Sequence, residues 1–181
     1  MTFIILLLVL LVLVVLYFVN TYNGFVSKRN LVDEAFSTMD VYLVKRHDLI
    51  PNLVATVKGY ATHEAETLEK IISARSMTGT RAEQLSTESE ITAQIKNIFA
   101  VAEAYPELKA NQSFNNLQSS LMGIEDEIAK ARKYYNATVR NYNTAIESFP
   151  ASYIANAKGF LKEPMFEVSN EEQRENVKVE F

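Results

Sequence analysis

The sequence predicts an all-α protein, in which a single N-terminal transmembrane helix continues into an antiparallel bundle of three or four long helices, with a short C-terminal helix and an extended tail. Three observations support this. An unbroken apolar run opens the chain, apolar residues recur at helical spacing through most of the remainder, and the few Gly and Pro stand near the ends of predicted elements. The predicted parts are an anchor with its membrane-exit segment (1–24), a helical bundle domain (25–160) and a polar tail (161–181).

The apolar run covers residues 3–19 and contains no charge, no Gly and no Pro. About 17–25 residues suffice for a helix to cross the roughly 30 Å hydrocarbon core of a bilayer. We therefore predict a membrane anchor, represented by Phe3, Leu10 and Val19. A signal peptide is the alternative, but no basic residue precedes the run and no A-x-A-like cleavage site follows it.

The residue types at and after the C-terminal end of this run are typical of a membrane–water interface. Tyr17 and Tyr22 fit an interfacial aromatic belt, and Lys28 and Arg29 are placed to meet headgroups, although a merely solvated helix face explains these two charges equally well. Because basic residues follow the run and none precedes it, the positive-inside rule favours an external N-terminus and a cytoplasmic body.

Two helices are predicted between the membrane and residue 79. The first continues from the anchor to residue 47. Asp48 is suited to cap the second, because Pro51 is tolerated in a first helical turn, and Gly79 is suited to end it. The short connection makes these two helices antiparallel neighbours.

A third helix is predicted to begin at one of two capping boxes, Thr80-x-x-Glu83 or Thr87-x-x-Glu90, and to end before Pro106. The fourth helix has the most regular pattern of the chain and should stop at Pro150. Its apolar seam alternates steps of three and four through Phe114, Leu117, Leu121, Ile124, Ile128, Ala131, Tyr135, Thr138, Tyr142, Ala145 and Phe149.

A short helix is predicted after Pro150, over residues 151–160, and the tail that follows is polar. At its end, Val177, Val179 and Phe181 alternate with charged residues in the manner of a strand. Such a segment is either a frayed terminus or a strand that pairs with a neighbouring subunit. We therefore include these three residues in a candidate protein interface.

A second part of the candidate interface surrounds the predicted turn between the first two helices. Asp40, Arg46 and Asp48 gather there, together with Lys45. Capping and salt bridging within the chain are the simpler roles for these charges, and docking of a partner protein is the alternative.

The composition argues against catalytic activity and against metal, cofactor or nucleic-acid binding. The chain has no Cys and a net charge of −4 without a basic stripe, which disfavours thiol chemistry and nucleic-acid binding. His63 lacks the second His of an H-E-x-x-H motif, and no Gly-rich phosphate loop occurs. We predict no catalytic residue, no cofactor and no metal site.

Three stretches of the chain resemble the LemA family of bacterial membrane-associated proteins. They are RNLVDEAFSTMDVYLVKRHDLIPNLVATVKGYATHE (29–64), AYPELKANQSFNNLQ (104–118) and IEDEIAKARKYYNATVRNYNTAIESFP (124–150). Phe36 and Tyr42 depart from the Trp and Gln frequent in the family. The resemblance implies one N-terminal membrane helix, a body of long antiparallel helices and no enzymatic activity, and we expect this single-pass protein in the bacterial inner membrane. It also implies an envelope function; relatives include a magnetosome-membrane member, and some are encoded near membrane metalloproteases.

These inferences predict a non-enzymatic scaffold that is anchored in the membrane. A slender helical bundle cannot bury all the aromatic residues of the chain, and exposed apolar patches usually mark interfaces. The expected partners are the lipid bilayer and further copies of the chain, which would form a higher-order homo-oligomer that organises or shapes the membrane. The alternative is an adaptor or regulator of a membrane protease or an envelope-stress pathway.

Overall fold

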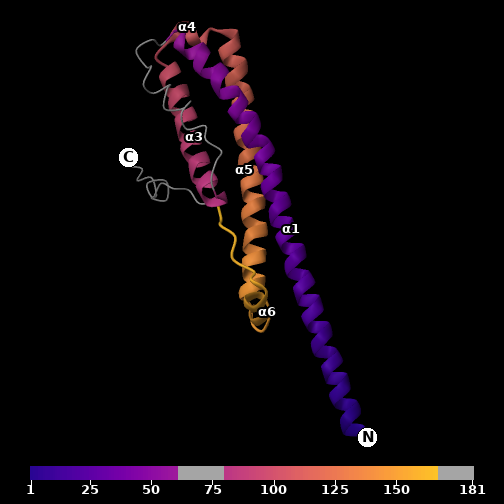
Figure 1. Cartoon of the computed structure of the whole chain (residues 1–181). Coiled ribbons are helices and arrows are strands. Elements are labelled where there is room, and N and C mark those ends of the chain that lie inside the picture. The colour runs from indigo at the N-terminus through magenta and orange to yellow at the C-terminus, as the bar shows by residue number, and fades with distance from the viewer. Residues whose placement is uncertain (61–79, 167–181) are drawn as a thin grey trace, which may run out of the picture. The chain divides into compact units, whose positions relative to one another are not determined.

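The computed structural model describes residues 1–60 and 80–166, and this part of the chain is helical without any strand, as predicted (Figure 1). The described helices are α1 (Thr2–Lys58), α3 (Arg81–Ala102), α4 (Pro106–Lys109), α5 (Gln112–Glu147) and α6 (Ala151–Lys158). The predicted strand residues Val177, Val179 and Phe181 lie outside the described residues.

Helix α1 is one continuous element from the apolar run to Lys58, so the predicted helix break at Asp48 is wrong. Pro51 lies inside the helix. A proline there removes one backbone hydrogen bond and costs about 3 kcal/mol. Burial of the surrounding side chains outweighs this cost, since each fully buried aliphatic side chain contributes about 1.5–3 kcal/mol. The buried residues around the proline are Ile50, Leu53, Val54 and Val57.

Helix α3 begins at the first of the two predicted capping boxes. The Thr80 amide donates to a Glu83 carboxylate oxygen at 2.7 Å, and the Glu83 amide donates to the Thr80 hydroxyl at 3.4 Å. Thr87 lies within the helix, where its hydroxyl donates to the Glu83 carbonyl. The helix ends at Ala102, and Pro106 then opens the short helix α4.

Helix α5 follows the predicted seam through most of its length, but the prediction fails at its end. Phe149 lies beyond the last helical residue and is 81% exposed, while Val139 and Ile146 are buried without belonging to the seam. A straight helix drifts by about 20° per heptad from a strict seven-residue repeat, which moves the buried stripe off the seam. The buried seam residues are Phe114, Leu121, Ile128, Ala131, Tyr135 and Tyr142.

The chain forms two compact units, and both α1 and α5 contribute to each. Of the described residues, unit 1 comprises Met1–Ser37 and Lys133–Met165, and unit 2 comprises 38–60, 80–132 and Phe166. The predicted boundary at residue 24 falls within α1. The three-part division of the sequence into anchor, bundle and tail stays a prediction.

In unit 1, side chains of α5 hold the segment that follows α6. The Tyr135 hydroxyl donates to the Pro164 carbonyl at 2.7 Å, and the Tyr142 hydroxyl donates to the Leu161 carbonyl at 3.0 Å. Asn143 makes two bonds to Glu163: its amide donates to the backbone carbonyl at 2.9 Å and its oxygen accepts from the backbone N–H at 3.0 Å. Backbone carbonyls of this segment thus satisfy the hydroxyl groups of both tyrosines.

We expect Asn143→Ala to loosen this segment and to lower the free energy of unfolding by about 1–3 kcal/mol, because it removes two hydrogen bonds to the backbone of Glu163. Hydrogen–deuterium exchange of the peptide over residues 160–166 should become faster. The matched control is Asn141→Ala on the exposed face of the same helix. Equal exchange rates of this peptide in the two variants would contradict the role of Asn143 in holding the segment.

The core of unit 2 is an apolar cluster to which α1, α3, α4 and α5 contribute. The rings of Phe99 and Phe114 meet edge to face with centroids 6.4 Å apart. This cluster fixes the helices that carry the polar groups described below. Its buried members are Ile50, Leu53, Val54, Val57, Ile91, Ile95, Ile98, Ala102, Leu108, Phe114 and Leu121.

Candidate functional site

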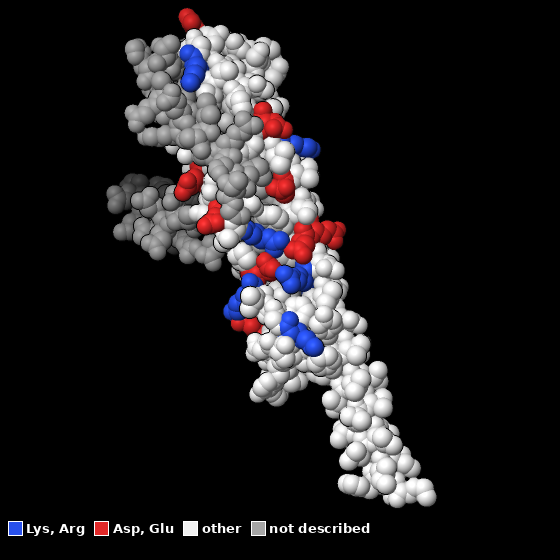
Figure 2. Space-filling view, viewed as in Figure 1, with Lys and Arg blue, Asp and Glu red and all other residues white. Residues whose placement is uncertain are grey.

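The predicted anchor residues lie on a fully exposed part of α1. Every side chain of residues 3–19 is between 38% and 75% exposed, including Phe3, Leu10 and Val19. This is the one described helix that is long and apolar enough to cross a membrane. The predicted interface residues Tyr17, Tyr22, Lys28 and Arg29 follow on the same helix and are also exposed. Figure 2 shows the N-terminal part of α1 as a surface without charged side chains.

The structure differs from the prediction at the candidate protein interface around Asp40, Arg46 and Asp48, which was expected to surround a turn. No turn separates these residues, because all three lie within α1. Asp40 is half-buried and Asp48 is exposed, whereas Arg46 is fully buried. Arg46 therefore belongs to the interior of unit 2, where it forms salt bridges within the chain, the simpler of its two predicted roles. The alternative, docking of a partner through Arg46, rested on a turn that does not exist.

Arg46 is the centre of a buried polar cluster in unit 2, which also contains His47, Glu88, Thr92 and Glu125. One guanidinium nitrogen donates to the Thr92 hydroxyl at 2.7 Å and to a Glu125 oxygen at 2.8 Å. The other pairs with the Glu88 carboxylate and donates to the Glu88 carbonyl at 3.3 Å. The cluster thus joins α1, α3 and α5 through one side chain.

His47 completes the pairing of Glu88, with its Nε2 atom 2.9 Å from the second carboxylate oxygen. Because a carboxylate only accepts hydrogen bonds, Nε2 carries the proton. Burial by itself raises the pKa of Glu88, but the hydrogen bond from His47 and the charge of Arg46 outweigh it, so the pKa lies below its ordinary value. Glu88 is therefore held in its charged form inside the protein.

This lowered pKa makes the folded state sensitive to acid. The stabilisation from ionised Glu88 is present above the unfolded-state pKa, near 4.5, and is lost as the pH falls through the lower folded-state pKa. We expect the free energy of unfolding to fall less steeply below pH 4.5 in Glu88→Gln than in the wild type. Urea titrations across pH 3–7 measure this difference. Glu90→Gln, at an exposed position of the same helix, should leave the slope as in the wild type. An unchanged slope in the Glu88 variant would contradict the prediction.

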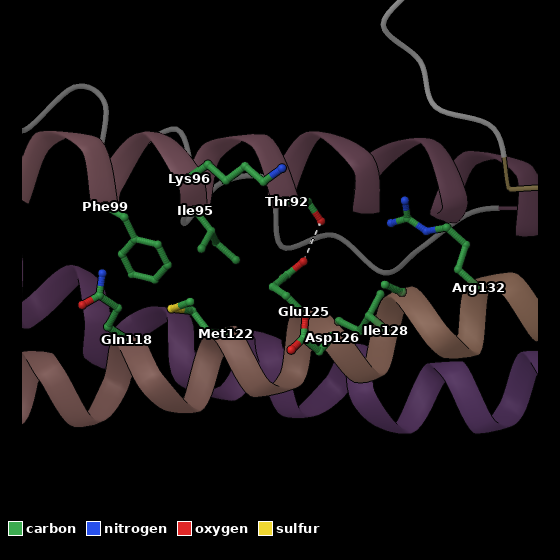
Figure 3. Close-up of a pocket in the computed structure, with 11 residues that line it drawn as sticks. Thr92, Ile95, Lys96, Phe99, Gln118, Met122, Glu125, Asp126, Ile128 and Arg132 are labelled. Carbon is green, nitrogen blue, oxygen red and sulfur yellow. Dashed lines mark hydrogen bonds between the residues drawn. The ribbon is translucent and has the colours of Figure 1, made fainter. Parts of the chain in front are cut away.

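A pocket of about 590 Å³ lies beside this cluster, between α3 and α5 of unit 2 (Figure 3). Its wall combines apolar side chains with charges of both signs. Glu125 links the pocket to the cluster, since its second carboxylate oxygen accepts from the Thr92 hydroxyl at 3.2 Å. The lining residues are Thr92, Ile95, Lys96, Phe99, Gln118, Met122, Glu125, Asp126, Ile128, Ala129 and Arg132.

Arg132 at one end of the pocket contacts an aromatic ring. Its guanidinium carbon lies 3.6 Å from the centroid of the Phe166 ring, and its Nε atom is buried without a hydrogen-bond partner among the described residues. Burial, followed by the charge of Arg46, lowers the pKa of Arg132. An anionic group of a ligand could therefore pair with Arg132 and Lys96. The described residues include no cluster of three or more potential metal ligands.

The sequence contains a signal for the buried cluster that the prediction did not use. Along α1 the buried residues Met39, Leu43, Ile50 and Leu53 recur at helical spacing. Arg46 lies three residues after Leu43 and four before Ile50, and therefore on the same buried face. Glu88 likewise stands three residues from both Leu85 and Ile91 on the buried face of α3. Opposite charges at core positions of two helices indicate a buried ion pair.

Comparison with known proteins shows a family match over most of the chain. The sequence model described as LemA family matches residues 35–181. Protein LemA of Metamycoplasma hominis is 25% identical over 160 residues, which cover 86% of this chain and 73% of that protein.

Two magnetosome proteins are also similar. Magnetosome protein MamQ of Magnetospirillum gryphiswaldense is 25% identical over 174 residues, which cover 80% of this chain and 64% of that protein. Magnetosome protein MamQ 2 of Paramagnetospirillum magneticum is 34% identical over 70 residues, which cover 39% and 26% of the two chains. The chain thus spans less than two thirds of these magnetosome relatives.

Proposed function

This chain belongs to the LemA family, as its sequence suggested, and from that membership and its exposed apolar helix we propose that it is a non-enzymatic, membrane-anchored structural protein. Copies of the chain assemble into a higher-order homo-oligomer that organises or shapes the bacterial inner membrane. Its relatives are named as LemA and magnetosome proteins, and neither name is that of an enzyme. This is consistent with a structural role.

The observation that carries the proposal is the exposed apolar segment of α1. A helix that is apolar on all sides and unburied needs an apolar surrounding. None of residues 3–19 is buried against the other described residues, so a bilayer is the surrounding that fits them. With Lys28 and Arg29 on its C-terminal side, we place the N-terminus outside and the body in the cytoplasm.

Within unit 1, the order of contacts supports an antiparallel arrangement of the helices. Phe25 contacts Phe160 with ring centroids 5.3 Å apart, and Phe36 contacts Tyr135 at 5.8 Å. A later residue of α1 therefore meets an earlier residue of the C-terminal half. We propose that the bundle is antiparallel throughout.

An outward-facing patch on α1 in unit 2 supports self-assembly. At 100° per residue, Val41 and Val44 lie on the side of the helix opposite the buried Leu43 and Arg46, and both are exposed. Asp40, Lys45 and Asp48 border them. We call these five residues the α1 patch.

The α1 patch is suited to meet a second copy of itself. In a two-fold contact, the same surface is presented by both subunits. The two valines supply an apolar centre, and Lys45 of one copy can pair with Asp40 or Asp48 of the other. Charges of both signs on one patch favour this self-complementary contact over a partner of a single charge.

A second candidate function is an adaptor or regulator of a membrane protease or an envelope-stress pathway. The pocket between α3 and α5 favours it, because its apolar wall and the cations Lys96 and Arg132 could hold an acidic segment of another protein. In this case the α1 patch would not be covered by a second copy of the chain.

Cross-linking in native membranes separates the two functions. The chain has no Cys, so Val44→Cys introduces a unique thiol for a bismaleimide. We expect a covalent product with the mass of two chains, and far less of it with Ser120→Cys at an exposed position of α5. A product that joins this chain to a different protein, identified by mass spectrometry, would contradict self-assembly and support the adaptor function.

A further inference from the structure

Three large apolar side chains of unit 1 are exposed although they lie far along the sequence from the predicted anchor. Phe149 is 81% exposed, Tyr153 71% and Leu161 78%. The rings of Phe149 and Tyr153 meet edge to face, with centroids 6.1 Å apart, so that they form one apolar surface at the start of α6. Ile154 and Ala155 face the interior, and α6 therefore presents its apolar residues on two sides.

Contacts within unit 1 place α6 beside the end of the apolar run of α1. The Lys158 ammonium lies 5.7 Å from the centroid of the Phe18 ring. Phe160, just after α6, contacts Tyr22 with ring centroids 5.7 Å apart. Figure 1 shows α6 beside this part of α1, and the N-terminal part of α1 extends past α6.

This level of α1 corresponds to the boundary of a bilayer. The apolar run ends at Val19, and Asn20 is the first polar residue after it. Tyrosine rings favour the headgroup region, and so do lysines at the ends of a span. Lys158 is exposed in the same part of unit 1 and supplies positive charge for lipid phosphates, whereas Lys162 pairs with Glu147.

We propose that Phe149, Tyr153 and Leu161 insert into the interfacial layer of the same bilayer that α1 crosses. This inference rests on the proposed membrane anchor. The occupant of the exposed surface is lipid, because α6 lies beside the end of the membrane span and carries Lys158 next to the aromatic ring of Phe18.

A second contact with the bilayer would orient the body. The tilt and rotation of a membrane helix are set by its packing and by interfacial aromatic and basic residues. With α6 in the interface, α1 can no longer turn freely about its own axis. Every anchored copy then presents unit 1 in one orientation to the membrane surface.

Spin labelling of the full-length protein in liposomes tests this proposal, and the absence of Cys allows single labels. Nitroxides are attached after Phe149→Cys or Tyr153→Cys, and power saturation measures their collisions with oxygen and with a water-soluble nickel chelate. We expect oxygen collisions to exceed nickel collisions several-fold at both positions. Tyr134→Cys is the matched control, an exposed tyrosine about 20 Å from the end of α5, where nickel collisions should dominate.

Two results would overturn the proposal. Nickel collisions as frequent as at position 134 would place α6 in water, and immobile labels with few collisions of either kind would place it against a protein. Val12→Cys, within the apolar run, tests the anchor itself. If that label contacts lipid and those on positions 149 and 153 do not, the interfacial contact fails alone. If the label at position 12 is also exposed to nickel, the proposed anchor fails.

Discussion

Replacing Leu10 and Leu13 together with arginine is expected to abolish the association of the protein with the membrane. On the insertion scale, each change from Leu to Arg at the centre of a membrane helix costs about 3–4 kcal/mol, so the pair costs about 6–8 kcal/mol. Such a cost lowers the inserted population by several orders of magnitude. After carbonate extraction and ultracentrifugation, the variant should be found in the supernatant and the wild type in the pellet.

The control for this experiment carries the same change elsewhere on the same helix. Val41→Arg with Val44→Arg also places two arginines three residues apart on an exposed face of α1. This control should remain in the pellet, because the apolar run is untouched. Recovery of the Leu10 and Leu13 variant in the pellet would show that residues 3–19 do not anchor the chain.

Arg46→Ala is expected to have the second largest effect, on stability. The substitution removes the partner of buried Glu88 and of Glu125. Breaking a buried ion pair at one side typically costs 3–5 kcal/mol, because the other charge is left buried. The free energy of unfolding should fall by this amount in urea titrations of the full-length protein in detergent, followed by circular dichroism.

Two further variants define the origin of this effect. Arg140→Ala, an exposed arginine on α5, should change stability by no more than about 0.5 kcal/mol. Arg46→Met combined with Glu88→Leu should be more stable than Arg46→Met alone, because both charges are then removed. A loss below about 1 kcal/mol in Arg46→Ala would show that the buried cluster does not secure the helices of unit 2.

Local signals in the sequence predicted several elements correctly. Thr80 and Glu83 fixed the start of α3, because a capping box satisfies backbone donors within a few residues. The helix predicted over residues 151–160 also exists, but α6 ends earlier, at Lys158, because Gly159 has a positive φ of 72°, which glycine adopts without strain. The apolar run predicted the exposed N-terminal part of α1, because the composition of residues 3–19 alone indicates a membrane helix.

The failures concern features that depend on tertiary packing. Pro51 and Asp48 suggested a helix start, but burial of neighbouring aliphatic side chains keeps α1 continuous. The roles of Arg46 and Glu88 required knowledge of which helix faces pack together. Their positions in phase with apolar residues could have revealed the buried pair, whereas the pocket between α3 and α5 could not be foreseen without coordinates.

The central proposal is that anchored chains assemble through the α1 patch. Its most direct test is the particle mass of the full-length protein, extracted into native nanodiscs and measured by mass photometry. We predict a discrete mass of many 20.5 kDa chains for the wild type, and a much smaller particle for Val41→Arg with Val44→Arg. A wild-type mass of one or two chains would contradict the scaffold function.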